Sequence, residues 1–176
     1  MRGLACIPDN AISGECAVHS PQELEDSFWH HLGRHPVVML GLEHEEGHSR
    51  PMTAQLEAGH GPLWFFSSKD SSLYQSLLSG NRAVAAFVAK GHELFATLSG
   101  TLVVDEDRQV IERLWNRFVA AWYEGGKEDP KLALLRFDAA DLQVWMNDVS
   151  VVSGIKLLLG ADPKKELAGN EAKIRI

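Results

Sequence analysis

The apolar and polar positions of the chain first predict a helix near the N-terminus. It begins at residues 20–23, because serine caps a helix, proline suits its first turn and glutamate completes a capping box. Leu24, Phe28 and Leu32 then recur at helical spacing. Gly33 follows them, so we expect the helix to end there.

Apolar runs of strand length fill much of the remaining chain. They cover residues 36–42, 48–57, 63–67, 83–89, 93–104, 132–137 and 142–146. A polar turn at 43–47 and a turn with two glycines and a proline at 57–62 separate the first three. Because the strands follow one another in hairpin order with few helices between them, we predict a mainly β fold, an antiparallel β-barrel with peripheral helices.

Three further helices are predicted outside the strands. Residues 70–79 form a short helix, and residues 155–159 begin another. Residues 105–123 form one long helix that ends at a pair of glycines. Its apolar stripe consists of Ile111, Leu114, Trp115, Phe118, Val119 and Trp122.

The 176 residues suffice for one domain with a hydrophobic core. We expect an irregular N-terminal arm at 1–19, the barrel domain at 20–160, and a charged, frayed C-terminal tail at 161–176.

The composition limits the classes of partner that the protein is expected to bind. A net charge of −7 argues against nucleic acid and against an anionic membrane surface. No apolar run approaches the length of a membrane span or of a signal peptide, so we expect a cytoplasmic protein. The two cysteines, Cys6 and Cys16, are too few for a disulfide scaffold and are expected to be inert thiols.

The polar turn at 67–72 precedes a helix and allows two interpretations. Hydroxyls and a lysine at a helix start are suited to a phosphate. The simpler interpretation is that Asp70 or Ser71 caps the helix and that Lys69 is solvated. Local sequence favours the simpler interpretation, because serine-rich caps are common.

The sequence contains no motif for nucleotide binding, acyl transfer or metal binding. No Walker A loop, dinucleotide-binding glycine motif or nucleophile elbow is present. Gly33 and Pro36 interrupt the helical spacing of His31 and His35. The eight histidines form no ligand set for zinc, and those flanking the acidic turn at 43–47 are expected to be solvated, so we predict no metal site.

Several segments together resemble a known family. They are 50–53 (RPMT), 63–71 (LWFFSSKDS), 81–84, 98–100, Trp115, 121–130 and 132–135. Their order and spacing resemble the pyridoxamine 5'-phosphate oxidase-like flavin-binding split barrels, in particular the bacterial general stress protein branch. The resemblance covers about residues 21–159.

This resemblance implies an antiparallel split barrel that binds FMN between the two subunits of a homodimer. By position it implies that 50–53 line the flavin ring and phosphate, that Phe66 and Ser67 face the flavin, and that three side chains of the following turn hold the phosphate. It also implies that Trp145 approaches the flavin from the other subunit and that Trp122 shapes the cleft, although both also fit a core or interface role. The cofactor-binding residues expected are Arg50, Pro51, Met52, Thr53, Phe66, Ser67, Lys69, Ser71, Ser72, Trp122 and Trp145.

Two departures from the family pattern bear on function. The usual lysine position is Leu73, preceded by Ser72 where true oxidases have arginine, so one or two charge-assisted bonds of about 1.5–3 kcal/mol each are missing. Residues 146–152 lack the arginine and histidine that hold substrate phosphate in those oxidases, so a vitamin B6 oxidase is not expected.

The first hypothesis is therefore an FMN-dependent oxidoreductase acting by hydride or electron transfer at the isoalloxazine ring, with an unknown substrate, an unassigned catalytic residue and a stress-related role. The second is a non-catalytic module that stores or senses flavin or haem. The third is a dimerisation scaffold whose pocket has decayed.

Overall fold

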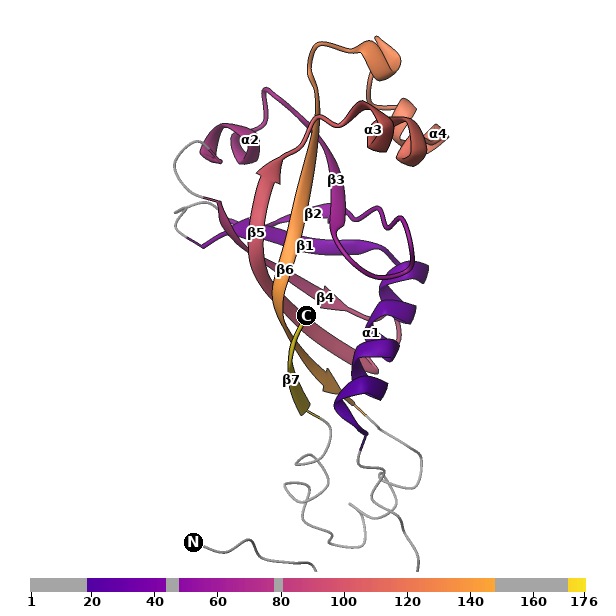
Figure 1. Ribbon diagram of the computed structural model, residues 1–176, viewed down its shortest axis with the longest axis vertical. Helices are drawn as coiled ribbons and strands as arrows, with labels where there is room; N and C mark the ends of the chain where they lie inside the picture. The colour runs from indigo at the N-terminus through magenta and orange to yellow at the C-terminus, as the bar shows by residue number, and fades with distance from the viewer. Residues whose placement is uncertain (1–18, 44–47, 78–80, 148–170) are drawn as a thin grey trace, which may run out of the picture.

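The computed structural model describes residues 19–43, 48–77, 81–147 and 171–176 (Figure 1). The strands in this part are β1 (Val37–Leu42), β2 (Arg50–Thr53), β3 (Leu63–Ser68), β4 (Arg82–Val88), β5 (Leu94–Val104), β6 (Leu132–Met146) and β7 (Glu171–Arg175). The helices are α1 (Pro21–Arg34), α2 (Ser72–Ser76), α3 (Arg108–Leu114), α4 (Arg117–Ala120) and the 3-10 helix η1 (Gly126–Glu128).

The strands form one antiparallel sheet that curls into a split barrel. Their order is β2-β1-β4-β5-β6-β3, with β7 added on β6. The two end strands meet through a single bridge, in which the Gln55 and Trp64 backbones exchange hydrogen bonds of 2.7 and 3.0 Å. Since this is the one bridge that joins them in the described part of the chain, the sheet is not closed, and the predicted antiparallel split barrel is confirmed.

Helix α1 packs against the barrel as its sequence predicts. Ser20 and Glu23 form the expected capping box, and Leu24, Phe28 and Leu32 are buried. The Phe28 ring meets that of Phe87 on β4 edge to face, with centroids 5.8 Å apart. Fully buried aromatic rings of this kind dominate the energy of a core, so α1 is a part of the barrel core rather than an appendage.

A second, smaller hydrophobic cluster lies between α3 and the outer side of β3 and β6. Its buried members are Trp64, Val110, Ile111, Leu132 and Leu134. Because α3 follows β5 directly, this packing fixes where the chain runs between β5 and β6.

The long helix expected at 105–123 is wrong. Trp115 adopts an extended backbone that ends α3, and the Asn116 side chain accepts hydrogen bonds from the backbone N–H groups of Phe118 and Val119, capping α4. A capping side chain competes with helix continuation. The apolar stripe is consequently broken: Phe118 is 69% exposed and Trp122 85% exposed.

The two strands expected at 132–137 and 142–146 are one strand, β6. Residues 138–141 between them continue the strand, and the register with β5 shifts opposite them, between Ser99 and Gly100. A β-bulge accommodates an extra residue without ending the strand. A Cβ at Gly100 would overlap the Asp138 carbonyl, so the glycine allows the close approach of the two strands.

The frayed tail expected at 161–176 is wrong at its end, because Glu171–Arg175 pair with β6 as β7. Residues 161–170 lie outside the described residues. The strand expected at 48–57 is shorter, at Arg50–Thr53. The expected arm with Cys6 and Cys16, the acidic turn at 44–47 and the helix at 155–159 lie outside the described residues, and the domain boundaries stay a prediction. None of the helices in the described part is long and apolar enough for a membrane span.

Candidate functional site

The structure brings Arg50 on β2 to the start of α2. Its Nη1 donates a 2.7 Å hydrogen bond to Ser72 Oγ, across 22 residues of sequence. Both residues were predicted to hold phosphate, and this contact places a guanidinium beside a hydroxyl. A guanidinium presents several N–H donors in a fixed plane, which suits phosphate oxygens.

Two more predicted residues form a hydroxyl pair next to this contact. Ser67 Oγ and Ser71 Oγ lie 3.0 Å apart. Ser71 caps α2 by accepting the Tyr74 backbone N–H at 3.2 Å, which confirms the predicted cap. Ser67 is 8% exposed and is the buried polar side chain among the described residues. Its hydroxyl is therefore held in one place rather than left to rotate in solvent.

The Lys69 side chain is directed to a carboxylate. Its Nζ lies 2.8 Å from Glu106 Oε1, and this hydrogen bond raises the pKa of Lys69 above its ordinary value. The Lys69 backbone is also fixed, since its N–H donates to the Lys131 carbonyl at 2.8 Å and its carbonyl accepts from Gln75 Nε2 at 2.7 Å. Neither interpretation of Lys69 foresees Glu106, which comes from a different part of the sequence.

Leu73, at the family's usual lysine position, is fully buried in the barrel core. The position thus contributes packing and no charge. A second cation does approach this turn, because Lys131 Nζ lies 2.9 Å from Asp70 Oδ2. This hydrogen bond raises the pKa of Lys131. The sequence carried no signal for Lys131, whose position follows from the pairing of β3 with β6.

The remaining predicted residues of β2 and β3 divide between two faces, since neighbouring strand residues point in opposite directions. Pro51 and Thr53 are exposed, whereas Met52 is half-buried against the core. Phe66 lies away from Ser67 and meets the Trp115 ring edge to face, with centroids 5.9 Å apart. The structure therefore does not bring Phe66 and Ser67 together as one pair.

Tyr123 joins this aromatic group to the serine group. Its ring lies 6.1 Å from that of Trp115, and its hydroxyl donates a 2.7 Å hydrogen bond to the Ser67 carbonyl. Burial raises the pKa of Tyr123 to about 12, so the hydroxyl keeps its proton in the ordinary pH range. The sequence did not point to Tyr123, because the apolar stripe of the predicted helix includes its neighbour Trp122 and not Tyr123 itself.

Trp122 and Trp145 do not join the serine group within one chain. In the described part neither makes a ring contact or side-chain hydrogen bond with it, and α2 and α4 lie on opposite sides of β6 in Figure 1. Trp145 is half-buried on β6, opposite Phe95 of β5.

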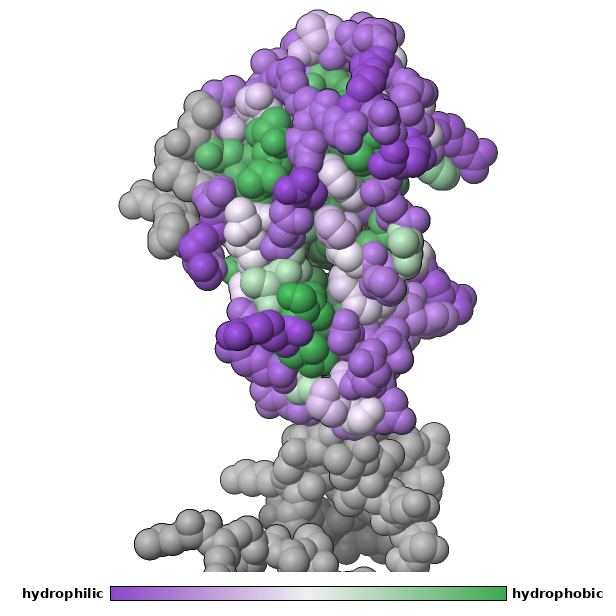
Figure 2. All heavy atoms as spheres, viewed as in Figure 1, coloured by the Kyte–Doolittle hydropathy of each residue, from purple (hydrophilic) through white to green (hydrophobic). Residues whose placement is uncertain are grey.

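Two apolar surfaces flank the serine group and the tryptophans. On the face in Figure 2, apolar side chains gather between α2 and the neighbouring end of β5, where Val104 is exposed two residues before Glu106. A second surface, here called the strand face, crosses β1, β4 and β5 and consists of the exposed side chains of Val37, Met39, Val88 and Phe95. The ladders join its parts: Met39 pairs with Pro51 and Ala86, and Phe95 with Val88 and Trp145.

In the described residues no three histidine, cysteine, aspartate or glutamate side chains are grouped as metal ligands. The donor set of the site consists instead of hydroxyls, a guanidinium and an ammonium group, and these suit an anion.

Comparisons of the sequence and of the structure with known proteins point to the same family. The profile described as pyridoxamine 5'-phosphate oxidase like matches residues 23–166. A general stress family protein of Xanthomonas campestris pv. campestris is 56% identical, with a TM-score of 0.71, over 76% of this chain and 93% of that one.

Two further solved structures are similar. The general stress FMN/FAD binding protein of Xanthomonas citri is 54% identical, with a TM-score of 0.70, over 74% of this chain and 93% of that one. A general stress protein 26 of Jannaschia sp. CCS1 is 26% identical, with a TM-score of 0.71, over 88% of this chain and 99% of that one. No curated protein matches the chain. The three solved structures named here are described as general stress proteins. The chain therefore belongs to the pyridoxamine 5'-phosphate oxidase-like family.

Proposed function

We propose that this protein binds FMN at the group formed by Arg50, Ser67, Ser71 and Ser72, and that it is a flavin-dependent oxidoreductase with a stress-related role. The Arg50–Ser72 hydrogen bond of 2.7 Å carries the proposal, because it joins β2 to the turn after β3. The relative from Xanthomonas citri, described as an FMN/FAD binding protein, supports the choice of cofactor. A cytoplasmic location stays a prediction.

The donor set fits a flavin phosphate. Arg50 supplies a fixed positive charge, and the hydroxyls of Ser67, Ser71 and Ser72 supply neutral donors within reach of one another. Lys69 adds a second charge once it leaves Glu106, a surface ion pair of the kind worth little free energy. The missing charge at Leu73 is thus partly offset by Arg50, which reaches the same turn from another strand.

FMN, when bound, supplies hydride or electron transfer at its isoalloxazine ring. The chain's own residues bind and orient it: Arg50 and the serines hold the phosphate end, and the apolar surface beside β5 excludes water from the ring. We assign no general acid or base, because the ionisable side chains of this group either make ion pairs or serve as phosphate donors.

We further propose that two chains associate through the strand face to form a homodimer. Val37, Met39, Val88 and Phe95 expose apolar surface across adjoining strands, and contiguous apolar surface of this kind typically marks an interaction site. Trp145 borders this face through its pairing with Phe95. In such a dimer Trp122 and Trp145, which make no ring contact or side-chain hydrogen bond with the serine group in the described part of their own chain, complete the partner's flavin site.

A second candidate function is a non-catalytic flavin module for storage or sensing. The observation that favours it is the burial of Leu73 together with the pairing of Lys69, which leaves Arg50 as the principal charge for the phosphate. Haem is the alternative planar cofactor for such a module. A weak site need not retain its cofactor through turnover.

The experiment is an FMN titration of the flavin-free protein, followed by flavin fluorescence and thermal unfolding. At 100 times Kd the cofactor stabilises the folded protein by about 2.7 kcal/mol. Arg50→Ala is expected to weaken binding roughly 10- to 150-fold, because a charge-assisted bond is worth about 1.5–3 kcal/mol. Lys69→Ala is expected to weaken it only a few-fold, since its charge is shared with Glu106.

The FMN-loaded protein also distinguishes the oxidoreductase from the non-catalytic flavin module. Bleaching of bound flavin by NADH or NADPH supports the oxidoreductase, whereas flavin that binds but is not reduced supports the module. If FMN gives no thermal shift at any reachable concentration, both lose their basis. Arg113→Ala, which breaks a distant ion pair with Glu57, is the matched control and should bind FMN as the parent does.

A further inference from the structure

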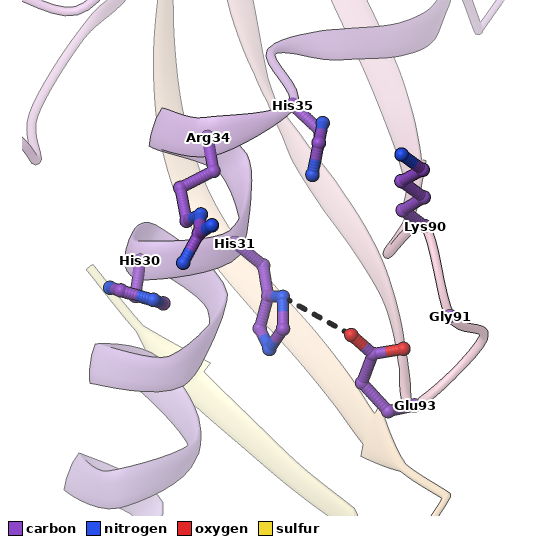
Figure 3. A pocket seen from close by; sticks show the side chains of 7 residues that line it. All are labelled: His30, His31, Arg34, His35, Lys90, Gly91 and Glu93. Atoms are coloured by element: carbon purple, nitrogen blue, oxygen red, sulfur yellow. Dashed lines mark ion pairs between the residues drawn. The ribbon is translucent and has the colours of Figure 1, made fainter.

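A hollow of about 500 Å³ lies between the end of α1 and the turn from β4 to β5 (Figure 3). This volume is within the range of small-molecule sites. Figure 3 shows His31 and His35 pointing from α1 into the gap, with Glu93 facing them from the turn. The ionisable side chains that line it are His30, His31, Arg34, His35, Lys90 and Glu93.

The side chains that line this hollow are mostly basic, although the chain as a whole is acidic. The protein carries a net charge of −7, yet five basic side chains gather here around one carboxylate. Arg34 and Lys90 outweigh Glu93 by one charge when the histidines are neutral, and by four when His30, His31 and His35 are protonated. The hollow is therefore a local basic site on an acidic protein.

Most of these basic groups have no side-chain partner among the described residues. Glu93 Oε1 lies 3.5 Å from His31 Nδ1, and this is the one ion pair among the lining groups in the described part of the chain. Arg34, His35 and Lys90 make no side-chain hydrogen bond or ion pair with any described residue. Their N–H donors remain available to a ligand.

The turn fixes the backbone of Glu93 and leaves room for its side chain beside His31. The Glu93 carbonyl accepts the Asn147 N–H at 2.7 Å, and His92 has a positive φ of 60° that folds the turn back. A Cβ at Gly91 would overlap the Glu93 carboxylate, so glycine leaves room for that side chain. Glu93 therefore lies where an anion bound by His31 would lie.

The end of a helix explains only part of this arrangement. Cations in the last turn of a helix interact favourably with its dipole, and this accounts for His31 and Arg34. It does not account for Lys90, which comes from a separate hairpin and adds a like charge to the same gap. Like charges brought together from two elements repel one another unless an anion lies between them.

We propose that this hollow binds a small molecule that carries a phosphate or sulfate group, with Arg34 and Lys90 as permanent charges and His31 and His35 as charges that depend on pH. The ligand takes the place of the Glu93 carboxylate at His31. The site is separate from the proposed flavin site, because it is built from α1 and the β4–β5 turn and shares no residue with Arg50 and the serines.

Affinity for the anion should rise as the pH falls, because histidine is the side chain that gains its charge between pH 8 and pH 5. The groups that face the hollow from α1 and from the turn, and those next to them, are His30, His31, Arg34, His35, Lys90, His92 and Glu93. Of these, Glu93 alone opposes an anion, and protonated His31 both attracts the ligand and retains Glu93.

The test is an NMR titration with sodium sulfate, whose charge is constant over this pH range, at fixed ionic strength. We expect saturable shifts of the Gly91 and His35 amide signals, with Kd roughly tenfold lower at pH 5.5 than at pH 8. The double variant Arg34→Gln/Lys90→Gln should weaken binding at least about tenfold at both pH values. Lys173→Gln/Arg175→Gln on β7, which removes the same charge elsewhere, should bind as the parent does.

Shifts that do not saturate, or that are equal in the two double variants, overturn the proposal, because they indicate ionic screening. Arg50→Ala should leave the Gly91 shifts unchanged, so that failure of the flavin site does not count against this one. Inorganic phosphate and ribose 5-phosphate then distinguish the source of the anion: equal affinity indicates a free oxyanion, and tighter binding of the ester indicates an organic phosphate.

Discussion

The serine group and the tryptophans differ in how they are held. Arg50, Ser67, Ser71 and Ser72 are joined by hydrogen bonds of 2.7–3.0 Å within one chain. Trp122, in contrast, is 85% exposed and makes no ring contact in the described part of the chain. Folding of a single chain thus fixes the geometry of the phosphate half of the proposed site. The aromatic half is left for a second chain to fix.

The boundary between these halves runs between two neighbouring residues. Trp122 points to solvent, and Tyr123 packs on Trp115 and donates to the Ser67 carbonyl. Sequence periodicity places Trp122 on the apolar stripe of one long helix and leaves Tyr123 out of it. In the structure the turn after α4 instead exposes Trp122 and packs Tyr123. Substitutions in the two halves should therefore have separable effects on folding and on assembly.

The largest expected effect is that of Met39→Glu on assembly. Met39 is 43% exposed on β1 within the strand face, so in the proposed dimer its replacement buries an unpaired carboxylate. Such burial costs several kcal/mol, and we expect the dimer Kd to rise at least about 100-fold. Sedimentation velocity over a concentration series measures this change.

Gln109→Glu, which adds the same charge on the exposed side of α3, is the control for Met39→Glu. It should leave the sedimentation profile unchanged. If Met39→Glu sediments as the parent protein does, the strand face is not the contact between subunits, and the tryptophans then lose their proposed route to the partner's site.

Tyr123→Phe should act on folding rather than on assembly. It leaves the Ser67 carbonyl without its 2.7 Å donor in a partly buried setting, so the free energy of unfolding should fall by about 1–3 kcal/mol. Urea unfolding followed by tryptophan fluorescence measures it. The control is Tyr74→Phe, since the Tyr74 hydroxyl makes no hydrogen bond among the described residues, and equal losses in both variants would contradict the role given to Tyr123.

Trp122→Ala is expected to lower FMN affinity and to leave the stability of the chain nearly unchanged. Because the ring is exposed in the single chain, the free energy of unfolding of the flavin-free protein should change by no more than about 0.5 kcal/mol. FMN affinity of the dimer should fall by about 2- to 12-fold, which corresponds to a lost aromatic contact of 0.5–1.5 kcal/mol. A drop in stability without a change in affinity would place Trp122 in the packing of the chain instead.

The sequence correctly predicted those features that depend on residues close together along the chain. The capping box before α1 was correct, because its signals lie within four residues of one another. The cap at Ser71 was correct for the same reason. The split-barrel fold followed from the family resemblance, and the ladders bear it out.

Errors arose where tertiary contacts override local pattern. One helix is predicted over 105–123, but the Asn116 side chain within it caps α4 and divides the helix. The sequence predicts two strands at 132–137 and 142–146, but a bulge opposite Gly100 carries residues 138–141 within a single strand, β6. Glu106 and Lys131 were missed because each reaches the site from a segment far along the chain, and no spacing rule links such residues.

The smallest expected effect, and the sharpest probe of the phosphate half, is that of Glu106→Gln. The Lys69 ammonium lies 2.8 Å from the Glu106 carboxylate, and this contact raises the pKa of Lys69. A flavin phosphate must compete with that carboxylate for the same cation. Removing the carboxylate charge frees Lys69, so FMN affinity should rise by about two- to fivefold, in keeping with the modest energy of an exposed ion pair.

Riboflavin, which has the same ring and no phosphate, provides the comparison that makes Glu106→Gln informative. Its affinity should not change in the variant, because it offers Lys69 no anion. Glu57→Gln, which breaks the distant ion pair with Arg113, should change the affinity for neither flavin. A gain for both flavins would mean that the carboxylate acts on the ring or on folding. No gain for FMN would mean that Lys69 stays outside the phosphate site and that Arg50 and the serines hold the phosphate alone.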